Sequence, residues 1–180
     1  MKTIFATIAA VAAIAFAGAA SAAPAPTGYY VQAGVGTNYQ SNRDTGIAYS
    51  AAVGKDFGLV RAEAEFIGTQ GSDSNKFGNL ASNLGNVNVY VQPTTVLGAT
   101  PFVGGGIGYG QMYRRGVVST NNNGIVFNAS TGFSYPLTEK MTLVTQYRYF
   151  LANDTKYTKN ARTVDNYNSS VTTVGVRYAF

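Results

Sequence analysis

The chain of 180 residues contains no cysteine and no histidine, and only 12% of its residues are charged. The absence of cysteine excludes disulfides and thiolate metal sites. Without histidine, the chain also lacks the commonest metal ligand and the commonest general base. No carboxylate cluster has the spacing of a calcium loop either, so we predict no cofactor and no metal.

Long apolar runs are also scarce, and the one that exists lies at the N-terminus. Lys2 precedes an Ala-rich apolar run over residues 4–16, and Ala20-Ser21-Ala22 follows it. A charged start, a short apolar core and an A-x-A site are typical of a secretory signal peptide. A membrane helix would need a longer run. We therefore predict a signal peptide over residues 1–22 and one mature domain over residues 23–180.

Apolar content is nevertheless high, at 46% of the chain. The C-terminal segment shows how it is distributed: Thr172, Val174, Val176, Tyr178 and Phe180 alternate with Thr173, Gly175, Arg177 and Ala179. A period of two is the pattern of a β-strand with two unlike faces. Strands that show one face to lipid can therefore account for an apolar content that no helix absorbs.

The same alternation recurs along the chain and predicts eight strands of about the length that a tilted strand needs to cross a membrane. Longer polar loops alternate with short turns between them, which a soluble sandwich does not require. We therefore expect an all-β fold, an eight-stranded antiparallel up-and-down transmembrane β-barrel. The expected strands cover residues 29–39, 47–55, 59–68, 86–92, 101–111, 125–135, 141–150 and 170–180.

Charged residues on the face away from lipid form a small set, which is Arg61, Glu63, Glu65, Arg148 and Arg177. Two carboxylates two residues apart could suggest acid–base chemistry. We favour a salt-bridged plug of the lumen, because buried charges need partners and eight strands enclose a space that side chains fill. We expect Arg148 to pair with Glu65 or Glu63, and Glu63 to lie between Arg61 and Arg177.

The glycines of residues 104–110 do not form a phosphate-binding motif, because neither G-x-G-x-x-G nor a Walker A pattern is present. We expect them to face inward beside bulky neighbours in a narrow barrel, or to ease its curvature.

Several segments resemble the opacity-protein and OmpA/OmpX-like family of outer-membrane barrels. The similar segments are Thr100–Gly110, Ser134–Leu137, Gln146–Tyr149 and the ending Val176–Phe180. The resemblance implies a bacterial outer-membrane location and implies that Tyr178 and Phe180 form the signal read by the barrel-assembly machinery. The small barrels that are enzymes rely on a histidine, which this chain lacks.

The expected outer loops carry more basic than acidic residues. Arg114, Arg115, Lys156, Lys159 and Arg162 are candidates for contacts with lipopolysaccharide phosphates or acidic host-surface molecules, although solvated loop charge explains them equally well. Scattered basic residues do not form a nucleic-acid footprint. We predict a non-enzymatic outer-membrane surface protein, structural or adhesin-like, with a small-solute porin-like channel as the alternative and an enzyme third.

Overall fold

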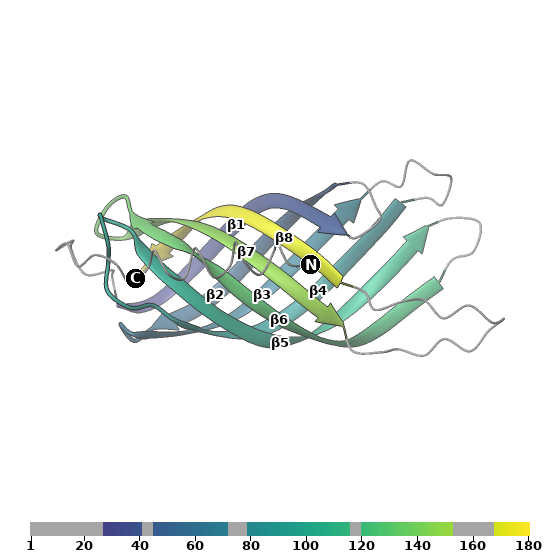
Figure 1. Ribbon diagram of the computed structural model, residues 1–180, viewed down its shortest axis with the longest axis horizontal. Coiled ribbons are helices and arrows are strands. Elements are labelled where there is room, and N and C mark those ends of the chain that lie inside the picture. Colours follow the sequence, from purple (N-terminus) through teal and green to yellow (C-terminus); the bar gives the residue numbers. More distant parts are fainter. Residues whose placement is uncertain (1–26, 41–44, 72–78, 116–119, 153–167) are drawn as a thin grey trace, which may run out of the picture.

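The computed structural model describes residues 27–40, 45–71, 79–115, 120–152 and 168–180. In this part of the chain, eight antiparallel strands close into one barrel, because each strand pairs with its sequence neighbours and β8 pairs with β1 (Figure 1). The strands are β1 (Gly28–Gln40), β2 (Gly46–Asp56), β3 (Val60–Gly71), β4 (Asn79–Val91), β5 (Thr100–Arg115), β6 (Thr120–Pro136), β7 (Met141–Ala152) and β8 (Asn168–Ala179). The predicted fold class is therefore confirmed.

None of the described residues forms a helix long and apolar enough to cross a membrane. The predicted signal peptide, residues 1–22, lies outside the described residues.

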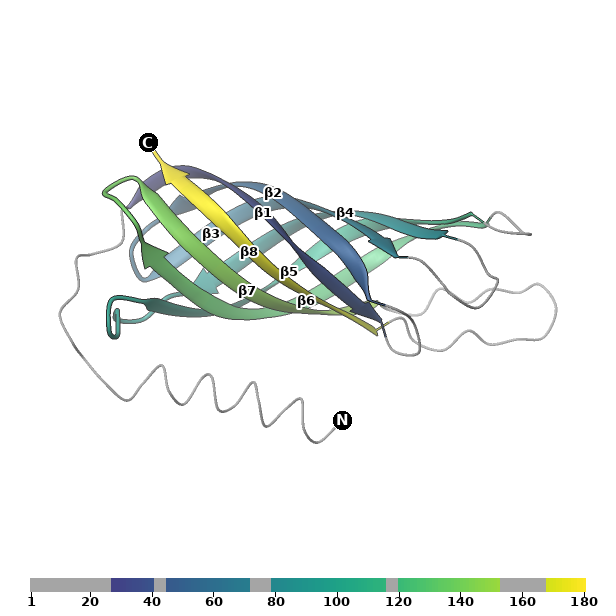
Figure 2. The ribbon, with the colours of Figure 1, turned by 90° about the horizontal axis from the view of Figure 1, so that it is seen from above.

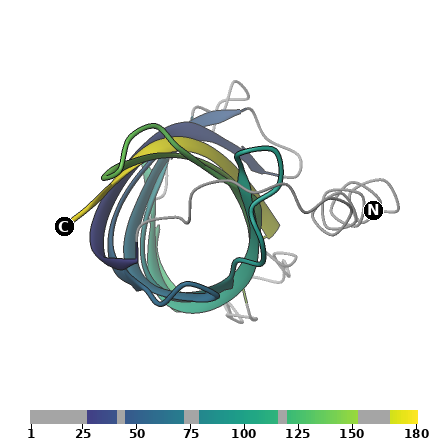
Figure 3. The same cartoon turned by 90° about the vertical axis from the view of Figure 1, so that its left-hand side faces the viewer.

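The strands are staggered around the barrel, which Figure 3 shows end-on as a closed ring. If each residue is followed to its register partner on the next strand, the path that starts at Tyr30 passes through β2 to β8 and returns to β1 at Gln40. The strands are therefore staggered by ten residues around the barrel. Stagger and strand tilt are linked in any closed barrel, and with eight strands the interior is just wide enough for side chains to fill. The side chains that face inward must therefore fit one another closely.

The two faces of each strand are opposite in character to those of a soluble barrel. In β3, Arg61, Glu63 and Glu65 are buried, while Ala64 and Phe66 face outward. Outward valines and isoleucines are widely exposed, with Ile47 at 68%. This is the arrangement of a barrel whose outer wall meets lipid and whose interior is polar.

Exposed aromatic side chains gather near both ends of the outer wall. At the turn end, where residues 57–59, 92–99 and 137–140 connect the strands, they are Tyr29, Tyr135, Tyr178 and Phe180. At the opposite loop end they are Tyr39, Tyr49 and Tyr109. Aromatic girdles of this kind mark the two membrane–water interfaces. Tyr149, near the loop end of β7, is only half-exposed.

Two of the expected loops are shorter than the sequence indicated. Residues 69–85 read as one polar loop, yet β3 continues to Gly71 and β4 begins at Asn79. Here Thr69 and Ser82, which are register partners, hydrogen-bond through their hydroxyls at 2.6 Å. Beyond the hydrocarbon a strand needs backbone pairing but no apolar face, so its polar composition hid it.

The same correction applies to residues 113–123, because β5 runs to Arg115 and β6 begins at Thr120. These two strands have 16 and 17 residues, against 11 in β2. Pairing of β6 with β7 ends at Val126 and Ala152, while its pairing with β5 continues to Thr120. Consequently the β4–β6 side of the wall reaches further than the rest at the loop end (Figure 2).

Candidate functional site

The lumen contains one short ion pair that crosses the barrel. Nη2 of Arg148 on β7 lies 2.6 Å from Oε2 of Glu65 on β3, and both side chains are almost fully buried. Asn88 donates to the same carboxylate oxygen, while Arg148 also donates to Ser130 and to the hydroxyl of Tyr90. One of the two expected partners of Arg148 is therefore the observed one, and the pair joins opposite walls.

Glu63 has partners different from those expected. Its Oε2 accepts a hydrogen bond from the hydroxyl of Tyr30 at 2.8 Å, and its Oε1 accepts one from Tyr90 at 3.2 Å. No ion pair joins Glu63 to Arg61 or Arg177 among the described residues. The expected partners were charged residues only, whereas the observed partners are tyrosines that face the same lumen.

Arg61 is held by aromatic rings. Its guanidinium carbon lies 4.2 Å from the ring centre of Tyr90 and 4.8 Å from that of Phe102, and the residue is completely buried. None of its guanidinium nitrogens has a hydrogen-bond partner among the described residues. A desolvated guanidinium over an aromatic face is attracted by the ring quadrupole, in the range of about 0.5–2 kcal/mol per contact.

Asp56 is a further lumen charge, at a position that falls between the expected strands 47–55 and 59–68. Its Oδ1 accepts a hydrogen bond from the backbone N–H of Gly58, and its Oδ2 accepts one from Nε2 of Gln92. The same Oδ2 lies 4.0 Å from Nη1 of Arg177. Arg177 also donates to Gln32 and stacks on Tyr30. With Asp56 included, the buried charged side chains of the described residues are three arginines and three carboxylates. Asp56 lies two residues from Gly54 and four from Ala52, both of which face inward, and this spacing could have identified Asp56 as a lumen residue.

Two apolar clusters occupy the lumen together with these charges. Toward the loop end, Ala48, Ile67, Phe150 and Val171 pack together with the half-buried Leu84 and Val126. Toward the turn end, Tyr90, Phe102 and Val144 form a second cluster. The first cluster draws on six strands and the second on β4, β5 and β7, so apolar side chains occupy the lumen at two levels, with the Arg148–Glu65 pair between them.

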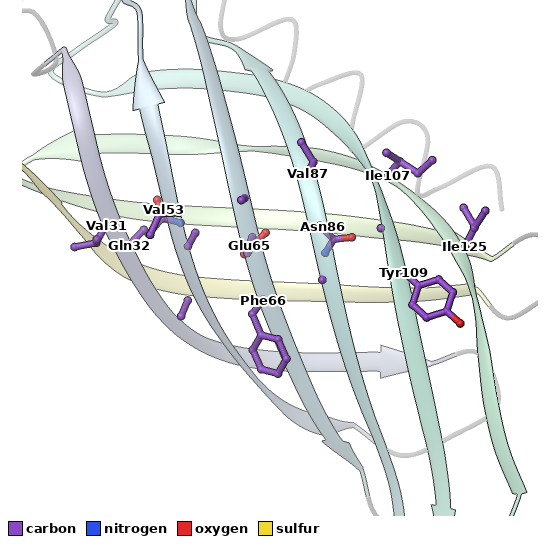
Figure 4. A pocket seen from close by; sticks show the side chains of 15 residues that line it. Val31, Gln32, Val53, Glu65, Phe66, Asn86, Val87, Ile107, Tyr109 and Ile125 are labelled. Carbon is purple, nitrogen blue, oxygen red and sulfur yellow. The ribbon is translucent and has the colours of Figure 1, made fainter.

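The outer wall carries a shallow apolar depression of about 870 Å³ that spans β1 to β6 (Figure 4). Among its lining residues, Ala51, Ala64 and Gly85 have small side chains or none, beside the larger Phe66 and Tyr109. Glu65 and Asn86 also line the depression, although their side chains are buried and face the lumen. The depression therefore offers an apolar surface to lipid chains and no charged group for chemistry.

The acid–base interpretation of Glu63 and Glu65 gains no support from this geometry. Arg148 and Asn88 engage Glu65, two tyrosines engage Glu63, and both carboxylates are buried between apolar clusters. Within the described ranges, no three acidic, histidine or cysteine side chains gather into a possible metal site.

The five basic residues expected in the outer loops are only partly within the described chain. The backbones of Arg114 and Arg115 lie at the loop end of β5, where they pair with Leu80 and Asn79 of β4. They therefore belong to a strand and not, as expected, to a loop. Lys156, Lys159 and Arg162 lie outside the described residues.

The two residues of the expected assembly signal lie at the turn end on the outer wall. Tyr178 and Phe180 are exposed, and their rings meet edge to face with centres 5.6 Å apart. The backbone N–H of Phe180 donates to the carbonyl of Tyr29 at 3.0 Å. The chain end is thus fixed to β1, while both rings stay accessible from the membrane side.

Comparison with known families decides where this barrel belongs, because residues 8–180 match the outer membrane protein beta-barrel domain. The chain belongs to this family. Members of this family lie in the outer membrane, and the apolar outer wall and polar lumen of this barrel agree with that location. The protein therefore resides in the bacterial outer membrane. No curated protein matched the chain.

Solved structures of other small outer-membrane barrels share the fold. Neisserial surface protein A has 19% identity and a TM-score of 0.71, with 86% of this chain and 98% of that chain covered. The N-terminal barrel of Pseudomonas aeruginosa OprF has 13% identity and a TM-score of 0.58, with 84% and 97% covered. Ail of Yersinia pestis, solved with the heparin analogue sucrose octasulfate, has 11% identity and a TM-score of 0.58, with 86% and 99% covered. At these identities the likeness concerns the fold alone.

Proposed function

We propose that this protein is a non-enzymatic surface protein of the outer membrane whose barrel is a closed support for adhesin-like loops. The observation that carries this proposal is the filled lumen. Two apolar clusters and a buried ion pair occupy the interior, so the barrel offers no wide path for solutes. Function is then left to the part that projects beyond the membrane.

The projecting part is asymmetric, and its basic pair lies at the furthest described point of β5. Arg114 and Arg115 close the extended β4–β6 side of the wall. Arginine binds phosphate and sulfate through paired N–H donors and keeps its charge. The heparin analogue bound by Ail makes a sulfated polysaccharide a sensible host-surface probe for this pair. Lipopolysaccharide phosphates, which lie in the same leaflet, are the second proposed contact. Lys156, Lys159 and Arg162 are proposed to extend the same basic surface.

Binding of intact cells to immobilised heparin tests the adhesin-like role. We expect Arg114→Ser/Arg115→Ser to lower the bound fraction severalfold, and 0.5 M salt to do the same, because screening weakens contacts between exposed charges. Lys140→Ser is the matched control, since this exposed lysine lies in a turn at the opposite end. Equal retention of the double variant and the parent would refute a role for the arginine pair.

The alternative, a small-solute channel, is tested separately in planar bilayers. A plugged lumen predicts no stable unitary steps from the purified protein at neutral pH. Large, reproducible steps would instead establish the channel and remove the argument from the filled interior. The two experiments have independent readouts, so failure of one leaves the other interpretable.

Export and assembly also belong to the proposal. We propose that residues 1–22 direct export and are removed, and that the barrel-assembly machinery recognises the Tyr178–Phe180 ending. The exposure of both rings at the turn end supports such recognition. N-terminal sequencing of the membrane-extracted protein tests the first part, because a mature start other than Ala23 would contradict it.

A further inference from the structure

Serine and threonine are unevenly distributed over the outer wall. Among the described strand residues, every outward-facing serine or threonine lies on β6, β7, β8 or β1, and none lies on β2 to β5. The outward set is Thr37, Thr131, Thr145, Ser170 and Thr172. The lipid-facing surface is therefore divided into a β2–β5 half without outward serine or threonine, called the apolar half below, which holds most of the depression of Figure 4, and a half that carries serine and threonine hydroxyls.

Three of these threonines and Tyr147 form one continuous row across four strands. Thr131 pairs with Tyr147, Tyr147 pairs with Thr172, and Thr172 pairs with Thr37. Register partners on the same face have Cβ atoms about 4.5–5.5 Å apart, so neighbouring side chains in the row touch. Thr145 flanks the row two residues from Tyr147 on the same face of β7. The row crosses the seam where β8 closes on β1.

Most of these hydroxyls are unsatisfied within the chain. Thr131 donates to the carbonyl of Phe102 at 3.1 Å, but the hydroxyls of Thr37, Thr145 and Thr172 have no partner among the described residues. All three are exposed on the outer wall. A hydroxyl without a hydrogen bond is costly in hydrocarbon, because lipid chains offer neither donors nor acceptors. The partner that covers this row must therefore supply hydrogen-bonding groups.

We infer that this row is the contact through which two copies of the chain associate within the membrane. A hydroxyl is both donor and acceptor, so the row is complementary to itself. In a two-fold dimer the same patch is used by both copies, and each threonine of one row can meet a threonine of the other. Hydrogen bonds between serine and threonine side chains are a recognised source of association between membrane segments.

The closed barrel supports this choice of contact. All eight strands are paired around the ring, so no free sheet edge is available to join two copies. Association then depends on side chains of the outer wall. The apolar half matches lipid, whereas the hydroxyl-bearing half gains more from a protein surface than from lipid.

Cysteine crosslinking in the outer membrane is a direct test, because the native chain contains no cysteine. Thr172→Cys lies in the middle of the row, and Ala64→Cys lies on the apolar half as the matched control. We expect an oxidant or a short bifunctional reagent to join Thr172→Cys into a species of twice the mass. Ala64→Cys should remain a monomer under the same conditions.

A second measurement removes the hydrogen bonds and keeps the shape. We expect Thr37→Val/Thr145→Val/Thr172→Val to reduce the dimer fraction in lipid at least about tenfold. Heat-modifiable migration on gels checks that this variant still forms a barrel. The inference fails if both cysteine variants crosslink equally, if neither does, if Thr172→Cys is joined to a different protein, or if the folded triple valine variant dimerises like the parent.

Discussion

The ring of Tyr90 occupies the space that a side chain at Gly104 would need. The two residues are register partners on β4 and β5, and a Cβ at Gly104 would meet the Tyr90 ring and the carbonyl oxygen of Val89. The same relationship joins Gly106 to Asn88 and Gly108 to Asn86. Gly104, Gly106 and Gly108 thus make room for the large inward side chains of β4, as expected of inward-facing glycines in a narrow barrel.

Gly104→Ala is therefore expected to destabilise the barrel by about 1–3 kcal/mol, the usual cost of overpacking a filled interior. Urea unfolding in lipid vesicles, followed by the gel shift between folded and unfolded forms, measures the change. Gly85→Ala is the matched control, because a Cβ there meets nothing within 4 Å and faces outward. Equal midpoints for the two variants would show that the interior tolerates the added methyl group.

Removal of one member of the Arg148–Glu65 pair leaves the other buried without its partner. Arg148→Gln is expected to lower the free energy of unfolding by about 3–5 kcal/mol. Adding Glu65→Gln should recover a large part of that loss, because the uncompensated carboxylate is then gone. A double-mutant cycle in urea measures the coupling. Glu139→Gln, in an exposed turn, should change stability by less than about 0.5 kcal/mol. Additive effects of the two lumen substitutions would argue against a coupled pair.

The apolar cluster at the loop end is expected to seal the lumen. Phe150→Ala removes the largest side chain of that cluster and should raise ion conductance across planar bilayers severalfold. Leu151→Ala is a neighbouring control of similar kind, because its side chain is exposed on the outer wall. Conductance that stays at the parent level in Phe150→Ala would mean that the polar layers below close the barrel unaided.

The exposed ring of Phe180 contributes little packing to the barrel, so its removal separates assembly from stability. We expect Phe180→Ala to reduce the amount of protein in the outer membrane severalfold. The urea midpoint of the refolded variant should match that of the parent, because Phe180 is 71% exposed. Leu137→Ala, at an exposed turn position of the same barrel end, serves as the control. Normal amounts of Phe180→Ala in the membrane would refute the proposed assembly signal.

Residue pattern by itself determined the barrel, its inverted faces and the inward position of five charges. Alternation with a period of two is local, so it separates the two faces of β3 and of β8 within each strand. That the charged face of β3 points inward followed from the whole pattern of eight strands with alternating loops and turns. The ends of β4, β5 and β6 were not predictable in this way. Outside the hydrocarbon, polar residues such as Asn79 and Thr120 occur equally in loops and in paired strands, so composition carries no signal there.

Only the tertiary structure decided which groups meet across the lumen. Closure with a stagger of ten residues brings Arg148 to Glu65, leaves Glu63 to two tyrosine hydroxyls, and adds Asp56 beside Arg177. These contacts join residues far apart in the chain, and their geometry depends on the stagger of the closed ring. The sequence alone determined which side of each strand faces lipid, because that follows from neighbouring residues; partner choice inside required the closed barrel.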